Sequence, residues 1–227
     1  VKYLGHIVSG AGIEVDEAKT QMVRQWPQPT SVKAVRSFLG TASYYRRFVP
    51  HFAEIAAPLH HLTRQDVKFV WTEACTEAFE HLKTALVSPP ILAYPSPQGQ
   101  YILDTDASKF GIGSVLAQVQ EGEERVIGYY SRALSKEEQR YCVTRKELLA
   151  VVDSIKHFKH HLYGVRFQVR TDHSSLRWLL NFKEPEDQLA RWLEILGTYN
   201  MEIKFRPGKY HGNSDGMSRL PCGPCDS

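Results

Sequence analysis

Residues 101–133 read YILDTDASKFGIGSVLAQVQEGEERVIGYYSRA, and this stretch decides the fold. Apolar residues, many of them β-branched or aromatic, gather at 101–106, 111–119 and 125–130, and short polar turns separate the three runs. Runs of this length and composition, bounded by turn residues, predict three consecutive strands joined as hairpins. The stretch therefore predicts the first part of a β-sheet.

The residues that follow predict helices and further strands that complete this sheet. In chain order we expect a long helix within 136–162, a strand at 165–171, helical stretches at 176–180 and 189–196, a strand at 201–205 and a short final helix capped by Asn213 or Ser214. This alternation predicts an α/β fold, in which a mixed sheet is covered by flanking helices.

The first part of the chain has a mostly helical pattern. Weak alternation in 1–9 predicts short strands, and Asp16, Thr30 and Thr72 are placed to cap three helices that follow. We expect a small, separate helical bundle over 16–88, joined to the sheet by a proline-containing segment near Pro95. Its core is predicted from five apolar residues at helical spacing: Val35, Phe38, Leu39, Phe79 and Leu82.

Composition limits the classes of protein to which the chain can belong. Its 227 residues suit one large domain or two small ones, and 42% hydrophobic with 23% charged residues is ordinary for a globular protein. No apolar run reaches the roughly 18 residues of a membrane helix, and no signal peptide is evident. The cysteines are too few and scattered for a disulfide framework, which favours a reducing compartment: Cys75, Cys142, Cys222 and Cys225. A net charge of +3 permits nucleic-acid binding without requiring it.

Four acidic residues stand where predicted elements begin or end: Asp106, Glu147, Asp172 and Asp215. Asp106 closes the first predicted strand of the sheet, Asp172 follows the fourth, and Asp215 opens the final helix. We place Glu147 in the first turn of the long helix. A fold that brings these positions together would crowd like charges into one volume, which requires cations. Hard oxygen ligands without Cys or His favour magnesium over zinc.

Each of these acidic residues also has a purely structural explanation. Asp106 could be a turn residue, Asp172 a helix cap, and Asp215 a favourable charge at a helix N-terminus. Glu147 fits a capping box that begins at Thr144, although Ser135 begins a second box that would start the helix earlier. These explanations account for each residue singly, but not for the acidic ends of four elements. Asp104, two residues before Asp106, shares its side of the strand and is the alternative ligand.

At these positions the chain resembles the polyprotein of gypsy-type (metavirus) LTR retrotransposons over nearly its whole length. The motifs that resemble the ribonuclease H part are LDTDAS at 103–108, GIGSVLAQ at 111–118, YYSRALS at 129–135, KELLAVV at 146–152, RTDH at 170–173, FRPGK at 205–209 and NSDGMSRLP at 213–221. The motifs that resemble the end of the reverse transcriptase palm and the thumb are YLGHIVS at 3–9, RSFLG at 36–40, YYRRF at 44–48 and FVW at 69–71, with AF at 78–79 and LK at 82–83. Their order and spacing together make the resemblance specific.

The resemblance implies a ribonuclease H-like mixed sheet preceded by a small helical region. The implied domains are the end of the palm with the thumb or connection at 1–95, ribonuclease H at 96–221 and a linker at 222–227. It implies Asp106, Glu147, Asp172 and Asp215 as catalytic ligands of two Mg²⁺ ions, for which Mn²⁺ can substitute, in cleavage of the RNA strand of RNA–DNA hybrids. A catalytically silent nucleic-acid-binding remnant of a decayed or domesticated element is the alternative.

Two departures from the family pattern matter. Around Asp215 the family usually has Ala-Asp-Ala-Leu-Ser-Arg, whereas this chain has Ser-Asp-Gly-Met-Ser-Arg, and Gly216 weakens a helix start there by up to about 1 kcal/mol. The paired aspartates of the family's polymerase site are absent from this chain. We therefore expect no DNA polymerisation by the chain alone, and expect the polymerase fingers and palm upstream and an integrase downstream in the same polyprotein as its partners.

Basic residues supply the candidate contacts to a hybrid: Lys33, Arg36, Arg46 and Arg47 in the helical half. A second basic group could equally be a solvated helix end: Lys156, His157, Lys159, His160 and His161. His211 could assist product release, as a histidine does in some related enzymes, or could be an ordinary surface residue. Cys222 and Cys225 form a lone Cys-x-x-Cys that a linker explains better than zinc does. The expected location is cytoplasmic, within virus-like particles if the element is active, or nuclear.

Overall fold

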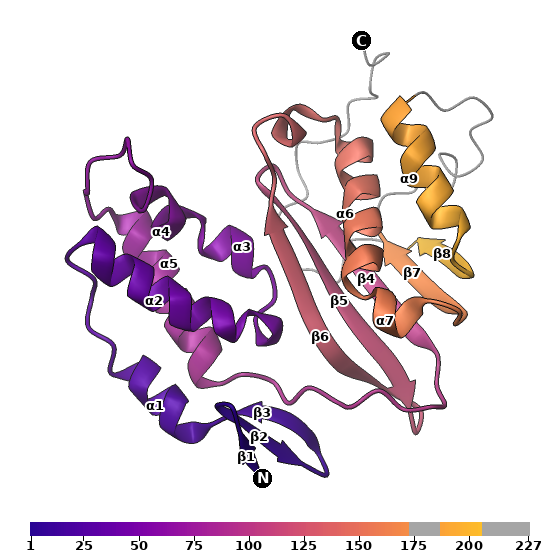
Figure 1. The fold of residues 1–227 in the computed structure, drawn as a ribbon, viewed down its shortest axis with the longest axis horizontal. Coiled ribbons are helices and arrows are strands. Elements are labelled where there is room, and N and C mark those ends of the chain that lie inside the picture. Colours follow the sequence, from indigo (N-terminus) through magenta and orange to yellow (C-terminus); the bar gives the residue numbers. More distant parts are fainter. Residues whose placement is uncertain (173–186, 206–227) are drawn as a thin grey trace.

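A computed structural model describes residues 1–172 and 187–205. Within these residues the chain forms two layered parts, a mostly helical N-terminal half and a five-stranded sheet with helices on one face (Figure 1). Each part has its own cluster of buried apolar residues. The prediction of a mixed sheet with flanking helices, preceded by a small helical region, is confirmed.

The N-terminal half begins with a small antiparallel sheet and continues as helices. The strands are β1 (Lys2–Tyr3), β2 (His6–Ser9) and β3 (Gly12–Val15), and the helices are α1 (Glu17–Arg24), α2 (Val32–Tyr44), the 3₁₀ turn η1 (Arg46–Phe48), α3 (Phe52–Ile55), α4 (Ala57–Leu62) and α5 (Glu73–Val87). Phe38 and Phe79 meet in the middle of this bundle with ring centroids 4.7 Å apart. All five residues predicted for this core are buried. Among the helices that the structure describes, none combines the length and the apolar character needed to cross a membrane.

The helix starts of this half confirm one predicted side-chain cap and correct another. Asp16 caps α1 through a hydrogen bond from the Ala18 backbone amide to its side chain. The prediction that Thr30 caps the next helix is wrong, because Ser31 has the extended backbone of a cap and accepts a hydrogen bond from Ala34. Thr72 stands at the start of α5, but its side chain makes no capping hydrogen bond.

The large sheet has the strand order β6-β5-β4-β7-β8. Its members are β4 (Tyr101–Ala107), β5 (Gly111–Gln120), β6 (Glu123–Ala133), β7 (Phe167–Thr171) and β8 (Met201–Phe205). The first three are antiparallel hairpins, whereas β7 runs parallel to β4 and to β8. Because parallel neighbours end at the same edge of a sheet, the last residues of β4 and β7 lie close together.

The long helix begins at neither of the two capping boxes that the sequence offered, but between them. The capping box at Ser135 does form, with reciprocal hydrogen bonds between Ser135 and Glu138, but it closes only the short 3₁₀ turn η2 (Glu138–Arg140). The helix α6 (Val143–His157) starts after Cys142, so the alternative box at Thr144 is also wrong. Glu147 consequently lies in the second turn of α6, one turn further along than we predicted.

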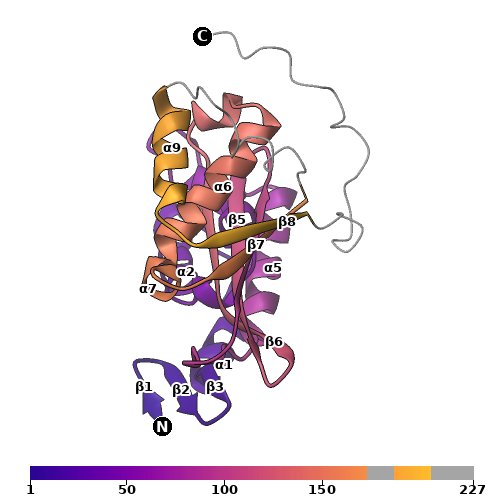
Figure 2. The same cartoon turned by 90° about the vertical axis from the view of Figure 1, so that its right-hand side faces the viewer.

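One face of the sheet is covered by helices α6 and α9 (Asp187–Gly197), with the short α7 (Lys159–Leu162) at its corner (Figure 2). Leu103 and Val169 project from β4 and β7 into this core and are fully buried. Arg145 of α6 joins the two helices, since its guanidinium lies over the rings of Tyr141 and Trp192. The predicted helical stretch at 189–196 is thus confirmed within α9, whereas the stretch at 176–180 lies outside the described residues.

The helical half packs against the edge strand β6 (Figure 1). Ser131 is the centre of this junction: its hydroxyl accepts a hydrogen bond from the Ala53 backbone amide at 3.0 Å, and its carbonyl accepts one from Arg46 at 2.6 Å. Val126 and Tyr129, also in β6, pack against the apolar core of the helical half. The two halves are therefore joined by specific contacts as well as by the segment near Pro95.

We predict that Ser131→Ala destabilises the seating of α3 on the sheet, because the buried amide of Ala53 then lacks its acceptor. Such a loss costs about 1–3 kcal/mol. Urea unfolding should show a lower free energy of unfolding for this variant, whereas Ser37→Ala on an exposed position of α2 should change it by no more than about 0.5 kcal/mol. Equal stabilities of the two variants would contradict the importance of this junction.

Candidate metal centre at the ends of β4 and β7

Three of the four predicted carboxylates come together at one edge of the large sheet. Asp106 is the sixth residue of β4, Asp172 directly follows β7, and Glu147 reaches the same edge from α6. One oxygen from each of the three carboxylates lies within 4.8 Å of the other two. The parallel pairing of β4 with β7 produces this convergence, because it places both strand ends beside the same helix.

Asp104 is committed elsewhere and does not belong to this cluster. Its carboxylate forms a two-pronged ion pair with Arg170, which lies directly across from it in β7, and one of these hydrogen bonds measures 2.7 Å. The same guanidinium binds Glu124 on its other side. Asp106, and not Asp104, is therefore the carboxylate of β4 that faces Glu147 and Asp172.

Glu147 carries the strongest electrostatic stress of the cluster. Only 3% of its surface is exposed, and one of its carboxylate oxygens, Oε2, finds no hydrogen-bond partner among the described residues. Burial first, and then the charges of Asp106 and Asp172, raise the pKa of this carboxyl to about 9. A hydrogen bond from the backbone amide of Ala107 lowers the pKa but does not offset these effects.

The donor set fits a hard divalent cation. All three converging side chains offer oxygen, and the partnerless Oε2 of Glu147 is the kind of buried polar atom that a bound ion satisfies. Asp106 and Asp172 are exposed, so the cluster is open on one side to solvent and to a ligand that brings further oxygen atoms. Carboxylates in an open oxygen site are typical of magnesium centres that also bind phosphate.

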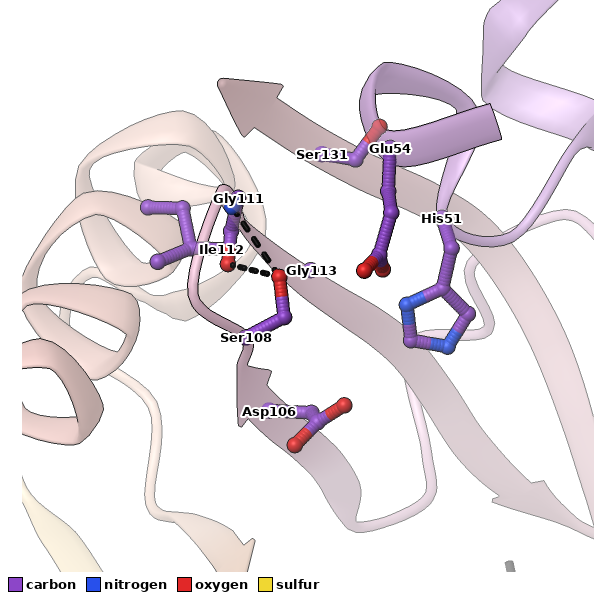
Figure 3. Close-up of a pocket in the computed structure, with 8 residues that line it drawn as sticks. All are labelled: His51, Glu54, Asp106, Ser108, Gly111, Ile112, Gly113 and Ser131. Carbon is purple, nitrogen blue, oxygen red and sulfur yellow. Dashed lines mark hydrogen bonds between the residues drawn. The ribbon is translucent and has the colours of Figure 1, made fainter. Parts of the chain in front are cut away.

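A crevice beside Asp106 brings in two residues that sequence analysis missed. His51 and Glu54, at the start of α3, line it together with Asp106 and with Ser108, Gly111, Ile112, Gly113 and Ser131 (Figure 3). No spacing in the sequence connects α3 with residues more than 50 positions later. Packing of α3 and His51 against β6 and β5 places them here.

The four basic residues predicted to bind nucleic acid occupy different environments. Lys33 and Arg47 are not buried. Arg36 donates a hydrogen bond to the carbonyl of Thr63 at 2.9 Å, and Arg46 is held by Ser131 and lies over the ring of Phe52. Arg46 thus has a structural role at the junction that the sequence did not indicate.

Two histidines of the second predicted basic group, His157 and His161, lie close enough to Arg47 to feel its charge. After the effect of burial, the charges of Arg46 and Arg47 further lower the pKa of His157, and Arg47 also lowers the pKa of His161. The end of α6 and α7 therefore lies near η1, although the two segments are about a hundred positions apart in the sequence.

Asp215, His211, Cys222 and Cys225 lie outside the described residues.

Comparisons with known proteins agree with this fold. Residues 71–169 match the family model of the RNase H-like domain found in reverse transcriptase. Over 225 residues, 97% of the chain, it is 38% identical to the Transposon Tf2-3 and Tf2-4 polyproteins of Schizosaccharomyces pombe. The chain spans 17% of the length of these relatives.

Two solved structures share the fold. The foamy viral protease-reverse transcriptase in complex with an RNA/DNA hybrid has a TM-score of 0.76 at 20% identity, and covers all of this chain with 31% of its own. Its form in complex with double-stranded DNA also has a TM-score of 0.76, at 21% identity, over 91% of this chain and 37% of its own.

The fold and the matched domain thus define a ribonuclease H-like domain of the reverse transcriptase class. More particularly, the chain is similar to LTR retrotransposon polyproteins, in agreement with the gypsy-type resemblance that its sequence motifs carry.

We predict that Glu147→Gln stabilises the metal-free protein, increasingly so as pH rises from 5 to 9. The folded-state pKa of Glu147, about 9, lies above its ordinary value of 4.5. The protonated carboxyl therefore contributes stability fully below pH 4.5, and this contribution is lost as pH rises toward 9, by up to about 1.4 kcal/mol per pH unit. The glutamine of the variant cannot ionise and should escape the loss.

Thermal unfolding in chelator-treated buffer at several pH values measures this difference. Glu77→Gln, on the exposed side of α5, is the matched control and should show no trend with pH. A constant difference between wild type and Glu147→Gln across this range would contradict the raised pKa.

Proposed function

We propose that the chain is the nuclease part of a retrotransposon reverse transcriptase and cleaves the RNA strand of RNA–DNA hybrids in a metal-dependent reaction. The observation that carries this proposal is the convergence of Asp106, Glu147 and Asp172 within 4.8 Å, around a carboxylate oxygen without a partner among the described residues. Without a cation, repulsion among three carboxylates destabilises the folded protein. A divalent cation bound in the working site would offset that repulsion.

In this proposal the carboxylates hold metal and act as neither nucleophile nor base. Asp106, Glu147 and Asp172 would hold two Mg²⁺ ions, or Mn²⁺ in their place, with Asp215 as a fourth ligand. When bound, such ions activate a water for in-line attack and stabilise the leaving 3′ oxygen. Glu147 must lose its proton before it can bind a cation, so loading of the site should release a proton.

The hybrid would be held mainly through its phosphates. Arg47 and Lys33 are exposed and offer positive charge on the helical half. A relative of the same fold has been solved in complex with an RNA/DNA hybrid. Contacts to phosphates predict binding that is sensitive to salt and largely indifferent to sequence, and contacts to the 2′-hydroxyl would select RNA for cleavage.

The relatives also suggest where the chain would work. They are polyproteins about six times longer than the matched segment, since the chain spans 17% of them. We propose that polymerase fingers and palm upstream and an integrase downstream are its neighbours in such a polyprotein. The proposed location is the cytoplasm, within virus-like particles where the element is active, or the nucleus.

We predict that Asp106→Asn abolishes cleavage without abolishing binding. The substitution keeps the size of the side chain but removes an anion that a metal ligand must supply, so the rate of cleavage of a labelled hybrid in Mg²⁺ should fall by about 10²-fold or more. Affinity for the hybrid, measured by fluorescence anisotropy, should persist because it depends on phosphate contacts elsewhere.

Asp104→Asn is the matched control, since it makes the same chemical change two residues away and outside the cluster. It weakens the ion pair with Arg170 and should lower stability, yet it should cleave at nearly the wild-type rate below its unfolding temperature. The opposite pattern would show that the site has been misplaced. Tight binding by a wild-type protein that leaves the hybrid intact in Mg²⁺ would favour the catalytically silent remnant.

We further predict that Arg47→Gln weakens hybrid binding for every sequence tested. Loss of one phosphate contact should reduce the slope of log affinity against log salt concentration by about 1. Arg166→Gln is the control, because the Arg166 side chain, just before β7, is 71% exposed and pairs only loosely with Glu202, at 3.7 Å. An unchanged slope for Arg47→Gln would remove this residue from the proposed interface.

A further inference from the structure

The crevice beside Asp106 is open because the residue opposite Asp106 is a glycine, which has no side chain. In the antiparallel pair of β4 and β5, Gly113 lies directly opposite Asp106. Residues opposite each other in such a pair project from the same face, with Cβ atoms about 5 Å apart. A side chain at position 113 would therefore stand next to the Asp106 carboxylate, and glycine leaves that space open.

The imidazole of His51 fills this space from the other half of the molecule. A Cβ atom built on Gly113 would lie 3.1 Å from Nδ1 and 3.4 Å from Cε1 of His51. The ring thus occupies the place of the missing side chain and lines the same crevice as Asp106 (Figure 3). His51, which belongs to the helical half, therefore lies beside the carboxylate site of the sheet.

The backbone holds His51 in an uncommon conformation to achieve this. Its φ of +51° is left-handed, which is infrequent for a residue other than glycine and persists only where the surroundings enforce it. The carbonyl of His51 accepts hydrogen bonds from the amides of Glu54 and Ile55, at 3.0 and 3.1 Å, and so fixes the start of α3. Ser131, directly opposite Gly113 in β6, then anchors α3 through Ala53.

Ser131, Gly113 and Asp106 consequently form one row across three strands, and α3 lies along that row. A ring N–H of His51 can donate a hydrogen bond into the crevice, whereas the converging carboxylates, once ionised, can only accept. A phosphate that approaches the carboxylates needs such a donor, because its own oxygens are also acceptors.

We propose that His51 is a positioning residue of the nuclease, which donates a hydrogen bond to a phosphate oxygen of the strand to be cut, at a linkage next to the scissile one. The inference rests on the proposed function and extends it: the helical half supplies part of the active site, in addition to affinity for the hybrid. Gly113 serves this arrangement by admitting the imidazole.

The first test needs no metal and no cleavage. Hybrids with a single neutral methylphosphonate linkage, moved one position at a time along the RNA strand, are bound by the full chain in chelator-treated buffer. Wild type should lose about tenfold in affinity at one linkage, as expected for a hydrogen bond to a charged group. His51→Asn should show no loss at that linkage, and asparagine tolerates the left-handed backbone, so α3 should stay in place.

The second test uses Gly113→Ala, which leaves His51 unchanged but crowds its ring. In Mg²⁺ at saturating hybrid, this variant and His51→Asn should each lower the cleavage rate about tenfold, and the double variant should be no slower than either one. His81→Asn on an exposed position of α5 and Gly40→Ala in open space on α2 are the matched controls and should cleave as wild type does.

Two outcomes would overturn the proposal. One is the same methylphosphonate profile for wild type and His51→Asn, and the other is an additive loss in the double variant, which would mean that positions 51 and 113 act independently. If wild type fails to cleave any hybrid, the proposed nuclease function fails, whereas the binding profile still decides whether His51 contacts a phosphate.

Discussion

Mutual repulsion among Asp106, Glu147 and Asp172 is the constraint around which this structure is arranged. Three carboxylates share a small volume, and one of them is almost fully buried. In the absence of a cation the fold accommodates them by keeping Glu147 protonated, because its pKa is raised to about 9. The parallel pairing of β4 with β7 and the position of α6 hold these charges together. A change in either would move the carboxylates apart, so the two strands and the helix serve the site as well as the core.

The same sheet register that places Asp106 also connects the site to the helical half. Asp106, Gly113 and Ser131 lie opposite one another on successive strands. Ser131 binds the backbone of α3. Gly113 leaves room for the imidazole of His51, which directly precedes α3 and lines the crevice beside Asp106. The helical half is therefore joined to the sheet at the point where its residues can reach the carboxylates, which gives the junction a functional meaning beyond the burial of apolar surface.

Much of this arrangement could be predicted from the sequence, because it depends on local patterns. Strands bounded by turns and acidic residues at element ends pointed to Asp106 and Asp172, which the structure brings together, and motif resemblance selected Asp106 over Asp104. The start of α6 could not be predicted from capping boxes, because the box at Ser135 is satisfied in a 3₁₀ turn that ends at Arg140 and α6 follows Cys142 without a side-chain cap. The positions of His51 and Arg46 could not be predicted, since they follow from contacts between segments about 60 to 85 positions apart.

We infer that the three carboxylates form a divalent metal centre. Crystals of the chain grown with a hybrid and soaked in Mn²⁺ would test it directly, because anomalous scattering locates manganese without reference to activity. We expect anomalous peaks within coordination distance of the oxygens of Asp106, Glu147 and Asp172, and their loss in Asp106→Asn. A cluster that remains without a peak while the hybrid is bound, or manganese bound only elsewhere, would contradict it.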